Sequence, residues 1–113
     1  MSKKAKKKYR KLDPAVLQDI LARIVKIAKP EKIILFGSAA RGQMGPNSDV
    51  DLLIIKSGRY NHGRLIDKLY MNMEGEEAVD ILIFTPQEIE QYRDCPYLVI
   101  YPALREGKVV YAA

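Results

Sequence analysis

Three aspartates lie at the beginnings of apolar segments, where a chain can gather carboxylates for chemistry. Asp49 and Asp51 open the segment of residues 49–56 (DVDLLIIK), and Asp80 directly precedes an Ile-Leu-Ile run. In a strand, Asp49 and Asp51 project from the same face with their Cα atoms roughly 7 Å apart. Burying two like charges is costly unless something neutralises them. Arginine or lysine could do so, but Mg²⁺ matches clustered carboxylates better, because it takes oxygen ligands and shares them with phosphates.

The position of Asp80 extends this hypothesis. If the two acid-bearing segments are neighbouring strands in register, all three carboxylates converge at one end of a sheet. Three acids can support two metal ions about 4 Å apart, an arrangement that clamps the attacking and leaving oxygens in phosphoryl transfer. We therefore expect Asp49, Asp51 and Asp80 to form a site for divalent metal.

A candidate phosphate site precedes the acids in the sequence. Gly37 and Ser38 follow the apolar run of residues 32–36 (KIILF) and precede a predicted helical turn. Glycine permits close approach to the backbone, and amides at the start of a helical turn point toward an anion. The Ser38 hydroxyl adds a donor, and Arg41 is placed to reach the same anion or a nearby acid.

Each of these features also has a purely structural interpretation. Gly-Ser after a strand is often only a turn, and an Asp-x-Asp pair occurs frequently by chance. Asp49 would then cap a strand, and Asp80 would solvate a strand end. Because all of them occur in order and each stands at a strand end, their combination favours a phosphate and metal site.

The elements that must position these residues follow from periodicity and capping signals. Helices are predicted where apolar residues recur at helical spacing or where a capping box begins, and strands where short apolar runs are rich in β-branched residues. The expected elements are a helix over 14–28, a strand over 32–36, a helical turn over 39–42, a strand over 49–56, a helix over 60–74, a strand over 78–84, a helix from 86 to before 95, a helical segment over 97–105 and a strand over 108–111. Pro102 predicts a bend or a broken turn in the last helical segment.

This order predicts a single mixed α/β domain with a sheet of about four strands. The chain has 113 residues, 48% of them apolar, which is enough for one core. Residues 3–11 (KKAKKKYRK) hold seven of the 19 basic residues, so we expect residues 1–12 to be a disordered, lysine-rich tail before a domain over 13–113. The tail either contacts nucleic acid or an anionic surface or only aids solubility. The lone Cys95 and the lack of a long apolar run predict a cytoplasmic protein with no membrane contact.

The same residues carry a family resemblance. The segments 36–42 (FGSAARG), 48–52 (SDVDL) and 103–111 (ALREGKVVY), with Asp80 between them, resemble the nucleotidyltransferase superfamily of DNA polymerase beta. In length and single-domain build the chain is similar to the minimal nucleotidyltransferases, which are commonly antitoxins of HEPN-domain ribonuclease toxins. The resemblance runs from about residue 13 onward and implies the nucleotidyltransferase fold.

For the site, the resemblance implies that Gly37, Ser38, Arg41 and Ser48 contact the nucleotide. It implies that Asp49 and Asp51 ligate Mg²⁺, and that Asp80 completes the site and helps to activate the acceptor hydroxyl. The implied reaction transfers AMP from ATP to a tyrosine of the toxin and releases pyrophosphate. Pro102 and the lysine-rich tail depart from the family pattern, but neither departure affects the three acids.

Two alternatives remain open from the sequence. One is a binding module, an antitoxin that neutralises its partner by contact and keeps a relict nucleotide site. The other is a nucleotidyltransferase acting on RNA, which the tail favours, or on a small molecule. For a protein partner, four apolar residues of the C-terminal segment are candidates for the contact, although for each of them a place in the cap of the core is favoured: Leu98, Ile100, Tyr101 and Leu104.

Overall fold

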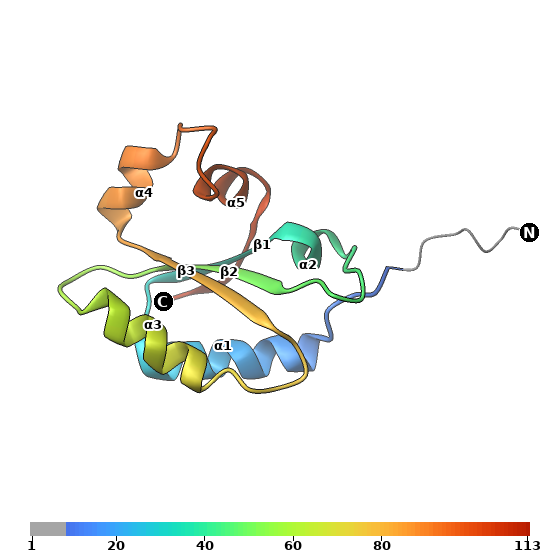
Figure 1. Ribbon diagram of the computed structural model, residues 1–113. Coiled ribbons are helices and arrows are strands. Elements are labelled where there is room, and N and C mark those ends of the chain that lie inside the picture. The colour runs from blue at the N-terminus through green and yellow to red at the C-terminus, as the bar shows by residue number, and fades with distance from the viewer. Residues whose placement is uncertain (1–8) are drawn as a thin grey trace, which may run out of the picture.

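A computed structural model describes residues 9–113 of the chain, and residues 1–8 lie outside the described part. Helices lie on both sides of an open four-stranded sheet (Figure 1). In chain order the elements are α1 (Pro14–Ala28), β1 (Lys32–Phe36), α2 (Gly37–Arg41), β2 (Val50–Ile55), α3 (His62–Met71), β3 (Val79–Phe84), α4 (Pro86–Tyr92), α5 (Ile100–Glu106) and β4 (Lys108–Ala112). The expected mixed α/β domain with a sheet of four strands is confirmed.

The sheet has the strand order β3-β2-β1-β4 and mixed directions. The central strand β1 is antiparallel to both β2 and β4, whereas β2 and β3 are parallel. Parallel neighbours need a crossover connection, and α3 supplies it. The register places Asp51 directly opposite Asp80. The two acid-bearing strands are therefore neighbours in register, as the sequence hypothesis required.

Apolar residues cover both faces of the sheet, so the strands have a separate core on each side. On one face, alternate residues of β1, β2 and β3, such as Ile33, Leu52 and Ile81, pack with α1 and α3. On the other face, the intervening residues, such as Ile34 and Leu53, pack with α4 and α5. Figure 1 shows these two helix pairs on opposite sides of the sheet. A one-residue slip of a strand would exchange its two faces, so the cores fix the register at the acids.

Local signals set the helix ends. Asp13 caps α1 by accepting a hydrogen bond from the Ala15 N–H at 2.8 Å, with Pro14 in the first turn. Thr85 and Glu88 form the predicted capping box of α4. Asn61 caps α3 through the Arg64 N–H, and this cap explains why α3 begins later than the expected residue 60. The helical turn begins at Gly37, two residues before the expected start.

The C-terminal segment differs from the expectation in two respects. The predicted break at Pro102 is wrong, since α5 runs unbroken from Ile100 and places the proline in its first turn, where a backbone N–H has no intrahelical acceptor. Ile100 is fully buried, so it is not a surface residue for a partner. Leu104 is partly buried against the same core and Tyr101 is partly buried, so both stay candidates. Leu98 is 40% exposed and stays a candidate, next to the more exposed Tyr97.

The described residues that precede α1 contact the domain. The backbone of Arg10 pairs with that of Met44 in an isolated antiparallel bridge, and Leu12 packs against the core. The remaining part of the predicted tail, residues 1–8, lies outside the described residues. Within residues 9–113 no helix is both long enough and apolar enough to cross a lipid bilayer.

Candidate active site

The backbone of Gly37 lies against the carboxylate of Asp51. Gly37 has a φ of 73°, in the left-handed region that favours glycine, and a Cβ built on it would collide with Oδ2 of Asp51. The neighbouring Phe36 is the register partner of Asp51 across β1 and β2. Both the φ angle and the close approach therefore require glycine at the end of β1, where the sequence predicts a phosphate cradle.

The helical turn α2 carries the other predicted phosphate-binding residues. Ser38 is half-buried next to Gly37, and Arg41 is exposed at the last position of α2. Gly42 ends the turn with a φ of 68°, and its N–H donates to carbonyls of α2. The turn thus places Ser38 directly after Gly37 and holds Arg41 within electrostatic range of the Asp51 carboxylate. Their roles in nucleotide binding stay predictions.

The three acids gather at one end of the parallel strand pair. Asp51 is half-buried on β2, while Asp80 on β3 and Asp49, just before β2, are exposed. Burial raises the pKa of Asp51, the negative charges of Asp80 and Asp49 raise it further, and Arg41 opposes the shift. No ion pair within residues 9–113 neutralises any of the three acids. The site therefore holds like charges that repel one another, and the positive charge of Arg41 offsets part of this repulsion at Asp51.

This donor set fits a hard cation shared with a ligand. The carboxylates of Asp51 and Asp80 stand on directly paired residues and offer only oxygen, which is what Mg²⁺ selects. Among the described residues no group of three His, Cys, Asp or Glu side chains closes into a metal cluster. The arrangement suits Mg²⁺, which commonly takes one or two protein carboxylates together with substrate phosphates. The assignment of Asp49, Asp51 and Asp80 as ligands stays a prediction.

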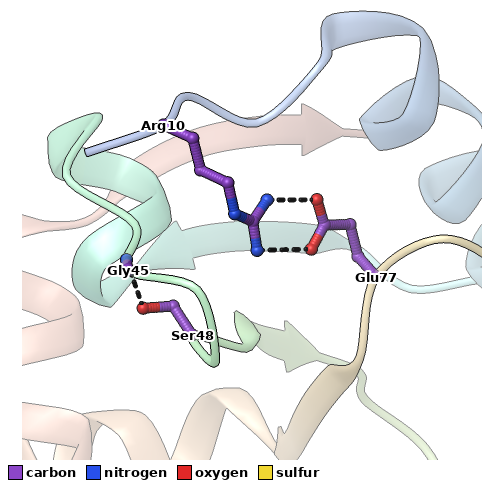
Figure 2. A network of polar contacts seen from close by, with 4 residues as sticks. All are labelled: Arg10, Gly45, Ser48 and Glu77. Atoms are coloured by element: carbon purple, nitrogen blue, oxygen red, sulfur yellow. Dashed lines mark hydrogen bonds and ion pairs between the residues drawn. The ribbon is translucent and has the colours of Figure 1, made fainter. Parts of the chain in front are cut away.

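Ser48, which the resemblance assigns to the nucleotide, is engaged in its own loop. Its hydroxyl oxygen accepts a hydrogen bond from the Gly45 N–H at 2.8 Å (Figure 2). Its own N–H donates to the Gly45 carbonyl. These bonds close the turn that leads into Asp49. In this structure Ser48 shapes the approach to the acids, and its contact with a nucleotide stays a prediction.

Tyr70 is a site residue that the sequence reasoning missed. From α3 its hydroxyl oxygen accepts a hydrogen bond from the Ile81 N–H at 2.8 Å and donates to Oδ1 of Asp80 at 3.3 Å. Burial raises the pKa of Tyr70, although the bond from Ile81 lowers it, and the negative charge of Asp80 raises it. The helical spacing of Tyr70 indicated only an apolar face, and no sequence pattern marks an unpaired N–H on an edge strand.

The chain matches the family model described as Polymerase beta, Nucleotidyltransferase over residues 18–113. A search of curated protein sequences finds no match. Several solved structures share the fold. A mutant of the toxin–antitoxin MntA-HpeT is 19% identical with a TM-score of 0.57, covering 90% of this chain and 75% of that one. A toxin–antitoxin with AMP-PNP is 19% identical with a TM-score of 0.56, covering 85% and 73%.

A third similar structure comes from Sulfolobus solfataricus and is described as a nucleotidyltransferase. It is 16% identical with a TM-score of 0.57, and the alignment covers 87% of this chain and 78% of that one. At these identities the three likenesses establish the fold.

The contact between Gly37 and Asp51 can be tested with a matched pair of alanines. Gly58 has a φ of 90° and only open space where a Cβ would stand, so Gly58→Ala measures the backbone penalty alone, about 1–2 kcal/mol. Gly37→Ala adds the collision with Asp51, and we expect it to cost at least about 1 kcal/mol more. Urea unfolding of both variants measures the difference. Equal losses would show that Gly37 is needed for its φ angle only.

The hydroxyl of Tyr70 is expected to stabilise the edge of the sheet. Tyr70→Phe leaves the N–H of the buried Ile81 without its acceptor, and we expect a loss of about 1–2 kcal/mol in the free energy of unfolding. Tyr92→Phe is the control, because within residues 9–113 the Tyr92 hydroxyl forms no hydrogen bond although the ring packs on the core. If both variants unfold at the same urea concentration, the bond to Ile81 contributes nothing.

Proposed function

Because this chain belongs to the polymerase beta nucleotidyltransferase family, we propose that it transfers AMP from ATP to a hydroxyl of a protein partner. The acceptor is a tyrosine of a HEPN-type toxin, so the chain acts as the antitoxin of a pair. The reaction uses Mg²⁺. The observation that carries the proposal is the half-buried Asp51, which lies against the backbone of Gly37 and directly opposite Asp80.

In the proposed reaction, the residues at the start of α2 and the three acids have separate tasks. Gly37 and Ser38 bind the triphosphate, and Asp49, Asp51 and Asp80 hold Mg²⁺, which neutralises charge that develops on the phosphate oxygens. The acceptor oxygen forms a bond to the α-phosphorus, and the bond from that phosphorus to the oxygen bridging to the β-phosphate breaks. Pyrophosphate leaves with that oxygen. The proton of the acceptor hydroxyl passes to the carboxylate of Asp80 and then to water.

Two observations favour a protein acceptor and an adenine nucleotide. Among the similar structures are toxin–antitoxin proteins, one of them with AMP-PNP, and the mutant one exchanges two aspartates spaced like Asp49 and Asp51. The described surface also exposes three consecutive apolar residues between α4 and α5, namely Tyr97, Leu98 and Val99. In this proposal the three residues are the contact surface for the partner.

Labelling with α-³²P-ATP tests the proposal. The protein is incubated with Mg²⁺ and a co-purified helical toxin partner, as wild type, as Asp49→Asn and as Asp51→Asn. We expect a labelled partner band with wild type and none with either variant, because a neutral amide lacks the negative charge with which a carboxylate binds Mg²⁺. Asp67→Asn is the control, because Asp67 is an exposed acid on α3 rather than on the two acid-bearing strands. Labelling that survives both substitutions contradicts the proposal.

Two other results would select a different activity. Label in RNA rather than in protein would indicate a terminal transferase, for which the lysine-rich segment would supply phosphate contacts. If neither wild type nor variants transfer label, yet all of them neutralise the toxin, the protein would be an antitoxin that acts by contact.

The charge arrangement gives a separate prediction for stability. Asp51 is partly desolvated beside two like charges, and its raised pKa shows that the folded state disfavours the ionised form. A carboxyl with a raised folded pKa stabilises the fold at low pH, and that contribution is lost as the pH rises through the folded pKa. At pH 7 in EDTA, Asp51→Asn should therefore raise the free energy of unfolding, by up to about 1 kcal/mol after screening by solvent. A variant less stable than wild type in urea would contradict this.

A further inference from the structure

Arg10 holds two loops that lie far apart in the sequence. Its N–H donates to the Met44 carbonyl at 2.9 Å, and its carbonyl accepts from the Met44 N–H at 3.1 Å. Its guanidinium donates to both carboxylate oxygens of Glu77, at 2.6 and 3.1 Å. Figure 2 shows the guanidinium facing the Glu77 carboxylate, with the turn of Gly45 and Ser48 beside it. The segment before α1 therefore contacts both loops at once.

Both loops lead into the candidate active site. Met44 belongs to the loop that ends at Asp49, and Glu77 stands three residues before Asp80. The loops also meet directly, since the Val50 N–H donates to the Ala78 carbonyl at 2.8 Å. Arg10 thus bridges the two chain segments immediately upstream of the acids, at the point where β2 and β3 begin.

The chemistry of the pair favours a defined geometry. The side chain of Glu77 is only 13% exposed and that of Arg10 is 40% exposed, so water screens this pair less than a surface ion pair. Two parallel hydrogen bonds fix the orientation of the guanidinium as well as its distance. Met44 is fully buried in the core between α1, α3 and the sheet, and it anchors the other end of the bridge. Loss of Arg10 would leave a largely buried carboxylate unpaired.

We propose that Arg10 and Glu77 are a positioning pair that aligns the loops carrying Asp49 and Asp80, so that the acids face one ligand before it binds. This inference rests on the proposed nucleotidyl transfer, since alignment of the acids matters only for a reaction there. Within residues 9–113 neither side chain forms a hydrogen bond or an ion pair with the acids. They act through the loops, and small displacements of reacting groups can lower a rate by as much as ~10²-fold.

Two kinds of measurement on the full chain test the pair. The first is amide hydrogen exchange over residues 43–50 and 76–81 without nucleotide, which does not depend on activity. The second is transfer kinetics with ATP and the toxin partner. In Arg10→Gln we expect exchange to accelerate in both loops. We expect kcat to fall about tenfold while KM for ATP changes little, because the variant misaligns the acids without removing a nucleotide contact.

Matched variants separate positioning from general stability. Arg93→Gln is the control, because Arg93 pairs with Glu90 on α4 at 3.2 Å, exposed and on the other face of the sheet, and it should change neither readout. The exchanged pair Arg10→Glu with Glu77→Arg should restore both the slow exchange and kcat. Arg10→Lys keeps the charge but loses the paired hydrogen bonds, and it should restore them only in part.

The outcomes distinguish this inference from the proposed function. Unchanged exchange in both loops of Arg10→Gln overturns the positioning pair, whatever the enzyme does. Faster exchange throughout residues 9–113, with no rescue by the exchanged pair, also overturns it and shows a general structural tie. If wild type transfers no label at all, the proposed function fails and the positioning role fails with it, while faster exchange confined to the two loops would still establish Arg10 as their tether.

Discussion

The site depends on a carboxylate that the fold holds in an unfavourable place. Asp51 is half-buried on β2, between the fully buried Val50 and Leu52, and its carboxylate lies against the backbone of Gly37 with Asp80 directly opposite. If β2 were not held by its neighbours, it would slide or rotate until the Asp51 carboxylate reached water. It cannot do so here, because sliding by one residue would exchange two apolar faces that are both covered by helices. The cost of gathering like charges is therefore offset by burial on both sides of the sheet.

This constraint explains why a short motif requires a whole domain. The glycine is needed because its backbone approaches the carboxylate, the short α2 is needed to turn the chain away, and the parallel pair β2 and β3 is needed to bring Asp80 level with Asp51. The crossover through α3 also brings Tyr70, whose hydroxyl satisfies the Ile81 N–H on the outer edge of β3 and reaches Asp80. The connection that makes the strands parallel thus also orients the third acid.

Short-range patterns in the sequence were sufficient for the elements and for most of the candidate site. The capping box at Thr85, the apolar runs of the strands and the spacing of the acids each depend on residues a few positions apart. The expectation of a break at Pro102 fails because the rule against proline applies to helix interiors, whereas α5 begins only two residues before this proline. The bonds of Tyr70 and of Arg10 were not predictable. They depend on which residues the finished sheet brings together, and the Arg10–Glu77 pair spans 67 positions.

The site needs support from outside its own strands. Asp49 and Asp80 are exposed and stand where β2 and β3 begin, so the two cores that fix Asp51 reach them only weakly. Loops at such ends open more readily than the strands they precede. Polar contacts hold these strand ends where the cores do not. Ser48 closes the turn before Asp49, Tyr70 hydrogen-bonds Asp80, and Arg10 joins the two loops. Apolar packing thus positions the central acid, and hydrogen bonds position the acids on either side of it.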